Sequence, residues 1–185
     1  YFIVEGDNGR PEVMVNPDAM GNAWFVDEVT CVDTPREESD ALNAIDFSKQ
    51  AVTDRKFSSM VLEPNTFSGE IALLSYAPDR LVYSSSCEGE KTAVFSDIYY
   101  PYGWKAYIDG APVEHFRVNY VLRALNVPAG EHEIMFEFRP DSIYKGFKVN
   151  ALFRYIMYTL IISLIVASVL RELGKGPKWL RDWGA

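Results

Sequence analysis

The sequence predicts a mainly β fold, an antiparallel β-sandwich or jelly-roll-like domain with one or two short helices, followed by a single transmembrane helix. Three observations predict it. Apolar and polar residues alternate along several short stretches, turn-forming residues separate these stretches, and an apolar run occupies 151–170. With 185 residues the chain can hold one domain of roughly 150 residues plus an appendage. We expect the β-rich domain over 1–148, the transmembrane helix over 149–171 and a basic tail over 172–185.

Short strands fill most of the predicted domain. The clearest is 131–139, where His132, Ile134 and Phe136 fall on one face and glutamates on the other, as in a half-buried strand. Helix is expected only between about Pro35 and Leu62, over 37–45 and 55–62. The other expected strands are 24–32, 69–76, 80–86, 91–97, 104–108 and 113–118.

Two turns connect strands near the end of the domain. Asp109-Gly110 has the residue types of a tight hairpin with positive φ, and Pro112 predicts that the returning strand starts at a sheet edge. Pro128-Ala129-Gly130 predicts a turn into the last strand.

The apolar run 151–170 predicts a membrane span because about 20 helical residues cover about 30 Å. A buried core helix would show a polar face, and 160–166 offers only Ser163. Arg154 is the one charge in the run and lies one turn inside its outer end. We expect its side chain to reach the headgroups as an anchor, with an anionic-lipid contact as the alternative.

Charge predicts the orientation of the span. Residues 1–150 hold 13 basic and 24 acidic side chains (13 − 24 = −11), and 151–185 hold 5 and 2 (5 − 2 = +3). The positive-inside rule places Arg171, Lys175, Lys178 and Arg181 in the cytoplasm and the acidic domain outside. An acidic domain argues against binding nucleic acid.

The two ends of the chain carry further expectations. Trp179 and Trp183 would suit either a short interfacial helix or an unstructured basic tail. An outer domain that precedes its only span needs an export segment upstream, so we expect this sequence to continue a longer protein.

Several segments together resemble a known family. They are 96–110 (SDIYYPYGWKAYIDG), 116–125 (FRVNYVLRAL), 127–138 (VPAGEHEIMFEF), 16–26 (NPDAMGNAWFV) and 140–146. The chain resembles the YfhO-like family of bacterial multi-pass membrane proteins, which is similar to the GT-C class of polyprenyl-phosphate-dependent glycosyltransferases.

The resemblance implies the C-terminal extracytoplasmic domain and terminal helix of such a protein in the bacterial inner membrane. It implies as partners the membrane lipid, the upstream transmembrane helices of the parent protein, and a polyprenyl-phosphate sugar or envelope glycan. The acidic residue expected to drive GT-C chemistry belongs to an early extracytoplasmic loop outside the matching segments. We therefore expect no catalytic residue and no cofactor in this chain.

An aromatic cluster is the first candidate binding site. Flat rings followed by Asp109 offer what a sugar-binding surface needs. The favoured alternative is that these rings serve the packing of the domain, because Trp104 alternates with Ala106 and Ile108 and so faces the core. The cluster comprises Tyr99, Tyr100, Tyr102, Trp104 and Tyr107.

A second candidate site contains two arginines. Arg117 and Arg123, with Asn119 and Tyr120 between them, suit a lipid-linked phosphate or a carboxylate. In so acidic a domain, pairing with internal Asp or Glu is the favoured alternative.

The histidines predict no metal site, and the cysteines leave a disulfide open. His115 and His132 have no second histidine at ligand spacing, and their neighbouring glutamates alternate to opposite faces. Cys31 and Cys87 could form a disulfide worth about 4 kcal/mol, or could be small buried residues.

We expect an accessory domain of a glycosyltransferase-like protein, with a carbohydrate-binding module and a tethered structural domain as rivals.

Overall fold

The structure is a computed structural model that describes residues 2–6, 10–16 and 18–175. The chain forms two compact units, Tyr1–Arg139 and Pro140–Ala185. The first ends before the predicted domain boundary at 148, since the helix of the second unit begins at Asp141.

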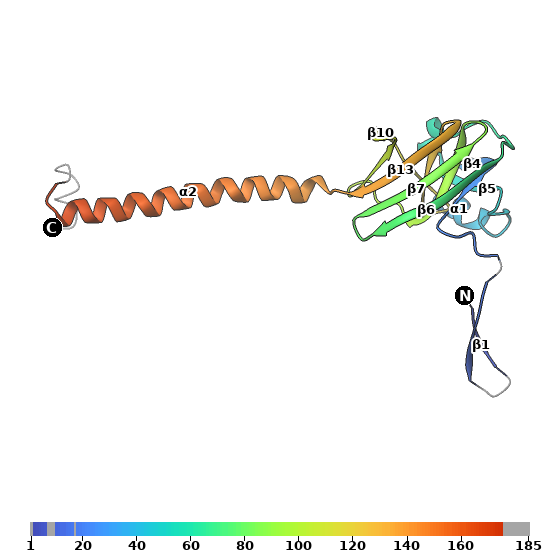
Figure 1. Ribbon diagram of the computed structural model, residues 1–185, viewed down its shortest axis with the longest axis horizontal. Coiled ribbons are helices and arrows are strands. Elements are labelled where there is room, and N and C mark those ends of the chain that lie inside the picture. Colours follow the sequence, from blue (N-terminus) through green and yellow to red (C-terminus); the bar gives the residue numbers. More distant parts are fainter. Residues whose placement is uncertain (1, 7–9, 17, 176–185) are drawn as a thin grey trace. The chain divides into compact units, whose positions relative to one another are not determined.

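Two antiparallel sheets form a sandwich in the first unit, as predicted (Figure 1). The five-stranded sheet has the order β10-β9-β13-β7-β6, and the four-stranded sheet the order β11-β12-β8-β3. The first comprises β6 (Gly69–Ala77), β7 (Arg80–Cys87), β9 (Trp104–Ile108), β10 (Ala111–Val113) and β13 (Gly130–Phe138). The second comprises β3 (Ala23–Val26), β8 (Lys91–Ile98), β11 (Phe116–Val118) and β12 (Leu122–Val127).

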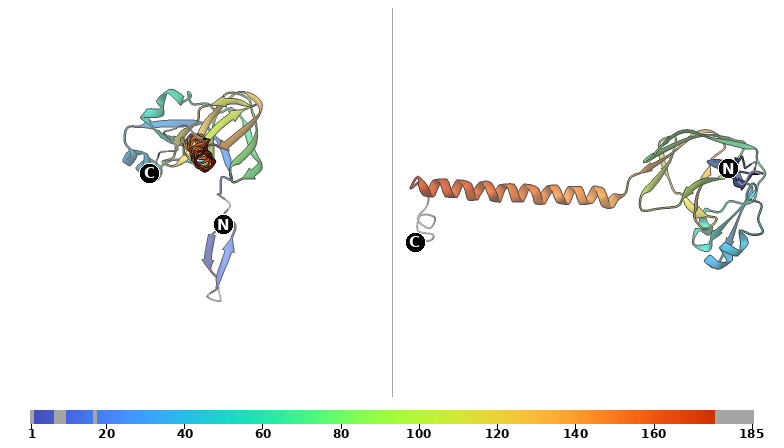
Figure 2. Two further views of the ribbon diagram at one scale, coloured as in Figure 1. Left: turned by 90° about the vertical axis from the view of Figure 1, so that its left-hand side faces the viewer. Right: turned by 90° about the horizontal axis from the view of Figure 1, so that it is seen from below.

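The remaining elements of this unit are short (Figure 2). β4 (Glu28–Val32) and β5 (Gln50–Asp54) pair in parallel, and α1 (Pro35–Ala41) connects them. The 3-10 helix η1 (Arg55–Met60) follows β5. A separate antiparallel hairpin joins β1 (Phe2–Glu5) and β2 (Pro11–Met14).

Two hydrophobic clusters lie on the two faces of the four-stranded sheet. Along β8, Ala93 and Phe95 contribute to the cluster between the two sheets, whereas Val94 contributes to a second cluster with Val29 and Ala51 of the β4–β5 pair. The four-stranded sheet is therefore covered on both faces, which explains why the first five residues of β8 are all buried instead of alternating.

Several element boundaries differ from the prediction. The expected strand 24–32 breaks into β3 and β4, which belong to different sheets, at Asp27, whose carboxylate accepts a 2.6 Å hydrogen bond from the buried Lys91 ammonium. The expected strand 113–118 breaks at Glu114-His115, where the chain crosses from β10 to β11. The helix expected over 37–45 is α1, and the one expected over 55–62 is the 3-10 helix η1.

Both predicted turns are present. Asp109 and Gly110 have φ of 51° and 79° and connect β9 to β10, which lies at the sheet edge as Pro112 indicated. Gly130 has φ of 117° at the start of β13, a conformation that favours glycine.

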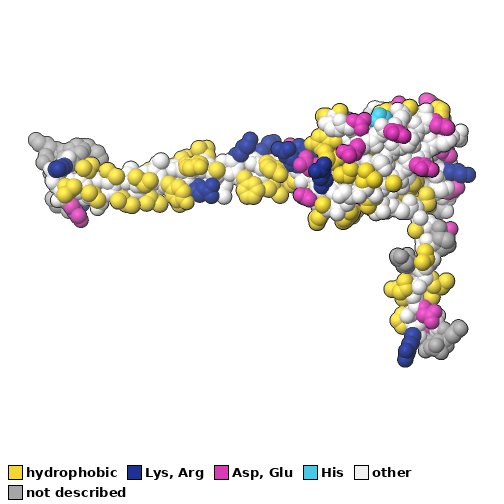
Figure 3. Space-filling model, in the orientation of Figure 1, with side chains coloured by type: hydrophobic (Ala, Val, Ile, Leu, Met, Phe, Trp, Pro, Cys, Tyr) yellow, Lys and Arg dark blue, Asp and Glu magenta, His cyan; other side chains and the backbone are white. Residues whose placement is uncertain are grey.

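The second unit contains α2 (Asp141–Glu172), which is long and apolar enough to cross a membrane. Hydrophobic side chains cover most of its length (Figure 3). The hydroxyls of Thr159 and Ser163 donate to the carbonyls of Ile156 and Leu160, which satisfies the polar groups within the helix. The helix ends before Gly174, which has φ of 66°. Lys178, Trp179, Arg181 and Trp183 lie outside the described residues.

Candidate functional site

An open groove of about 550 Å³ lies where the chain crosses twice between the two sheets. The β8–β9 loop is one crossing, and Glu114-His115 between β10 and β11 is the other. The 3-10 helix η1 supplies a further wall. We call this the aromatic groove; it is lined by Lys56, Phe57, Ser59, Met60, Tyr99, Pro101, Trp104, Lys105, Ala106, Tyr107, Pro112, Val113, Glu114 and His115.

Ring contacts hold the wall of the groove in place. The Tyr99 ring packs edge-on against Phe57 at 5.7 Å and against His115 at 5.3 Å between centroids. The Tyr99 amide donates a 2.8 Å hydrogen bond to the Val121 carbonyl, which fixes the start of the loop. Burial raises the pKa of the Tyr99 phenol, so its hydroxyl is neutral and can donate a hydrogen bond.

Trp104 lines the groove and is supported from the interior by Arg123. The guanidinium carbon of Arg123 lies 4.4 Å from the centroid of the Trp104 ring and 4.6 Å from that of Phe136. A register shift between Leu122 and Arg123 interrupts the pairing of β12 with β8 at this point. The Trp104 ring is therefore held half-buried, packed against the core as the packing alternative predicted, while it also faces the groove.

Arg123 is unable to reach a ligand in the groove. The residue is only 1% exposed, and its nearest carboxylate oxygen, on Asp97, lies 4.0 Å away. Asp97 also accepts a 3.3 Å hydrogen bond from the Tyr83 hydroxyl. Burial lowers the pKa of Arg123, and the nearby Asp97 carboxylate opposes this shift. Arg123 thus belongs to the packing of the core.

His115 also lines the groove, although the sequence suggested it only as a possible metal ligand. Burial, and secondly the charge of Arg123, lowers the pKa of His115 to about 4, so the imidazole is neutral at physiological pH. Its Nε2 atom is buried and has no hydrogen-bond partner within the described protein. A neutral imidazole can donate or accept a hydrogen bond, which suits a hydroxyl group.

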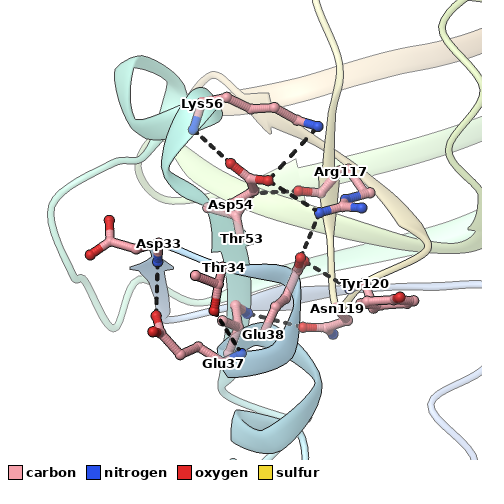
Figure 4. Close-up of polar contacts among 11 residues, drawn as sticks. Asp33, Thr34, Glu37, Glu38, Thr53, Asp54, Lys56, Arg117, Asn119 and Tyr120 are labelled. Atoms are coloured by element: carbon pink, nitrogen blue, oxygen red, sulfur yellow. Dashed lines mark hydrogen bonds and ion pairs between the residues drawn. The ribbon is translucent and has the colours of Figure 1, made fainter.

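Arg117, Asn119 and Tyr120 belong to a different network, around Glu38 (Figure 4). The Glu38 carboxylate is fully buried and accepts hydrogen bonds from the Arg117 guanidinium at 2.5 Å and from the Tyr120 amide at 2.9 Å. The side-chain carbonyl of Asn119 accepts from the Val52 amide at 3.0 Å.

This network connects α1 and β5 to the turn between β11 and β12. Asn119 and Tyr120 have positive φ of 50° and 71°, which bends the chain so that both reach the network. Asp54 lies 3.7 Å from Arg117. The arginine thus pairs internally, as its acidic surroundings indicated.

The structure therefore brings together only part of each predicted site. Tyr99, Trp104 and Tyr107 share the aromatic groove, whereas Tyr100 and Tyr102 are exposed beside it and do not line it. Arg154 lies within α2, in the second unit.

The cysteines and histidines have simple partners among the described residues. Cys31 and Cys87 are both free, with the Cys87 thiol donating to the Pro128 carbonyl at 2.9 Å. Among the described residues, no group of three or more His, Cys, Asp or Glu side chains could hold a metal ion. His132 instead bonds to Asp109 at 2.6 Å across the neighbouring turn.

No protein-family model, no curated protein and no solved structure matches the chain.

Proposed function

We propose that this chain is a membrane-anchored accessory domain that binds a glycan in the aromatic groove. The observation that carries the proposal is the gathering of Tyr99, Trp104, Tyr107 and His115 in one open groove. Half-buried rings provide flat apolar faces for a pyranose, and fixed polar groups between them can bond to its hydroxyls.

The rings and polar groups of the groove suit a sugar, and no arginine lines it. Both arginines that would suit a phosphate are committed elsewhere, Arg117 to Glu38 and Arg123 to the core beside Asp97. The groove contains a neutral imidazole, tyrosine hydroxyls, the exposed Glu114 and the two lysines Lys56 and Lys105. We therefore place the recognised part of the ligand in the saccharide, whether that saccharide is free, polymeric or lipid-linked.

The membrane assignment rests on α2 and on charge. A helix of this length and composition can cross a bilayer, and Arg171 and Lys175 follow its apolar portion. We propose that these cations lie in the cytoplasm and the sheet-built unit outside, at the bacterial inner membrane. The motifs that resemble the YfhO-like family support the further proposal that the parent protein is a GT-C-type glycosyltransferase, whose upstream helices would hold the catalytic centre.

Glycan titration of the whole chain in lipid nanodiscs tests this function. Envelope oligosaccharides and polyprenyl-phosphate sugars are added separately, and binding is followed by tryptophan fluorescence. Tyr99→Ala should weaken binding about tenfold, a loss of about 1.4 kcal/mol, because it removes an aromatic ring that packs against Phe57 and His115 in the groove.

Tyr102→Ala is the matched control, since Tyr102 is an exposed tyrosine of the neighbouring loop that does not line the groove. Binding that is unaffected by Tyr99→Ala, or equally weakened by both changes, would refute the groove as the site. No saturable binding to any sugar would leave the unit as a tethered structural domain.

A further inference from the structure

One end of the sandwich gathers exposed apolar side chains (Figure 3). Three backbone hydrogen bonds join the segments that meet there: the amides of Tyr99, Phe138 and Arg139 donate to the carbonyls of Val121, Asp79 and Gly103 at 2.7–2.8 Å. We call these side chains the apolar rim: Tyr76, Ile98, Tyr100, Tyr102, Tyr120, Val121 and Phe138.

The rim differs from the rest of this acidic unit. Its most exposed members are Tyr102, Ile98 and Tyr76, at 79%, 70% and 69%. The two loops that supply most of it, 99–103 and 119–121, contain no charged residue, although residues 1–150 hold 24 acidic side chains. A cluster of exposed aromatic and aliphatic side chains of this size indicates an interaction surface.

Ring packing makes part of the rim a fixed platform. The Tyr100 ring stacks on Phe138 at 6.4 Å and contacts Tyr102 at 5.9 Å between centroids, and Phe138 also packs against Trp104 at 5.3 Å. Gly103 allows this packing, since a Cβ atom there would collide with the rings of Phe138 and Tyr100. The aromatic rings are thus held outward by their neighbours.

Chain connectivity identifies the surface that the rim meets. Phe138 precedes Asp141, the first residue of α2, by three residues, so the chain holds it within about 11 Å of the helix start at any orientation of the two units. The segment 141–148 adds about 12 Å of helix before the predicted transmembrane helix starts at 149, and headgroups occupy about 5–8 Å of that length. The rim is therefore within reach of the headgroup layer.

We propose that the apolar rim rests on the lipid headgroups of the membrane that α2 spans. Tyrosine and tryptophan prefer this layer because their rings are apolar and their tips are polar. Tyr144, Lys145 and Lys148 at the start of α2 have the composition of the same interface. This inference needs α2 to be a span but does not need the groove to bind a glycan.

Docking of the rim would also place the groove close to the membrane. Tyr99 and Pro101 line the groove, and Tyr100 and Tyr102 of the same loop belong to the rim. A glycan bound in the groove would then lie beside the bilayer surface, where lipid-linked saccharides present their sugars.

The test uses the full chain in nanodiscs, without glycan, with one fluorinated aromatic residue at a time for fluorine NMR. The rim probe replaces Tyr102 by fluorotyrosine. The control probe replaces Phe67 by fluorophenylalanine; Phe67 is 46% exposed and lies against Gly89, just beyond the far end of β7. The eight residues of β7 separate the two ends by about 24 Å.

Two relaxation measurements then decide between docking and mere proximity. In the structure Tyr102 is more exposed than Phe67. Docking would cover Tyr102 and reverse this order of water access, so a water-soluble paramagnetic agent should relax the Phe67 probe several-fold more than the Tyr102 probe. A paramagnetic lipid headgroup should relax the Tyr102 probe more than tenfold faster than the Phe67 probe.

A Tyr102 probe that stays more accessible to the water-soluble agent than the Phe67 probe would overturn the proposal, even if the lipid headgroup relaxes it strongly. Equal relaxation of both probes by the lipid would overturn it as well. The companion change Tyr76→Ser with Val121→Ser should restore water access at Tyr102, because it removes two exposed apolar members of the rim.

Discussion

Arg117→Met should destabilise the sheet-built unit more than any ordinary surface substitution. The change removes the 2.5 Å bond from the guanidinium to the Glu38 carboxylate and the 3.7 Å contact with Asp54 (Figure 4). Glu38 is 0% exposed, and the bond from the Tyr120 amide would remain its one partner in this network. A buried carboxylate with one hydrogen bond and no paired cation lowers the stability of the folded state.

The expected loss of unfolding free energy is about 3–5 kcal/mol, the usual range for breaking one partner of a buried ion pair. For a unit of this size the loss corresponds to a fall in Tm of roughly 10–20 °C. Glu38→Gln keeps an oxygen for the Tyr120 amide and should cost less, about 1–3 kcal/mol.

Urea unfolding of the full chain in detergent, followed by tryptophan fluorescence, measures these losses. The double variant Glu38→Leu with Arg117→Met removes both charges and should lose clearly less than the sum of the single losses. If Arg117→Met costs under about 1 kcal/mol, or if the losses simply add, the buried pair does not connect α1 to the sandwich as described.

Three further outcomes follow from the same contacts. The lowered pKa of His115 means that the unfolded chain binds its proton first, so the free energy of unfolding should be full above pH about 6.5 and fall by about 3 kcal/mol towards pH 4. His115→Phe should flatten this pH dependence of the urea midpoint. The hydrogen bond to Asp109 raises the pKa of His132, so the stability that this bond contributes is present below pH about 6.5 and is lost as pH rises through the pKa of His132 in the folded protein. In an NMR titration, Asp109→Asn should return the pKa of His132 towards its ordinary value. Gly103→Ala should cost about 1–3 kcal/mol in thermal unfolding, because its Cβ would collide with Phe138, whereas an unchanged Tm would show that the rings can move apart.

Local signals in the sequence predicted much of the fold. The alternation in 131–139 and the residue types of Asp109-Gly110 each specify structure over a few residues, and both are present as β13 and its neighbouring hairpin. β5 was not predicted because Ala51, Val52 and Thr53 are all buried, so the strand shows no alternation. An alternating apolar and polar pattern identifies a strand that is buried on one face only, so it does not identify strands that are covered on both faces.

The candidate site was harder to predict because its parts come from distant segments. Phe57 in η1 and Tyr99 in the β8–β9 loop meet only because η1 and the β4–β5 pair pack on the outer face of the four-stranded sheet, which the sequence did not reveal. His115 was considered only as a metal ligand, since its burial beside Arg123 depends on the crossing between β10 and β11. The internal pairing of Arg117 was favoured by composition alone, although its partner Glu38 lies 79 residues away.

The chain contains two histidines, and this allows a direct test of the proposed groove. Nitrogen-15 NMR of the labelled imidazoles is recorded at neutral pH while an envelope oligosaccharide is added to the full chain in nanodiscs. A glycan bound in the groove should shift the His115 signals saturably, because this residue lines the groove. It should leave His132, which is bonded to Asp109 and does not line the groove, unchanged. Saturable binding with both histidines unchanged, or with His132 alone shifted, would contradict a glycan site in the aromatic groove.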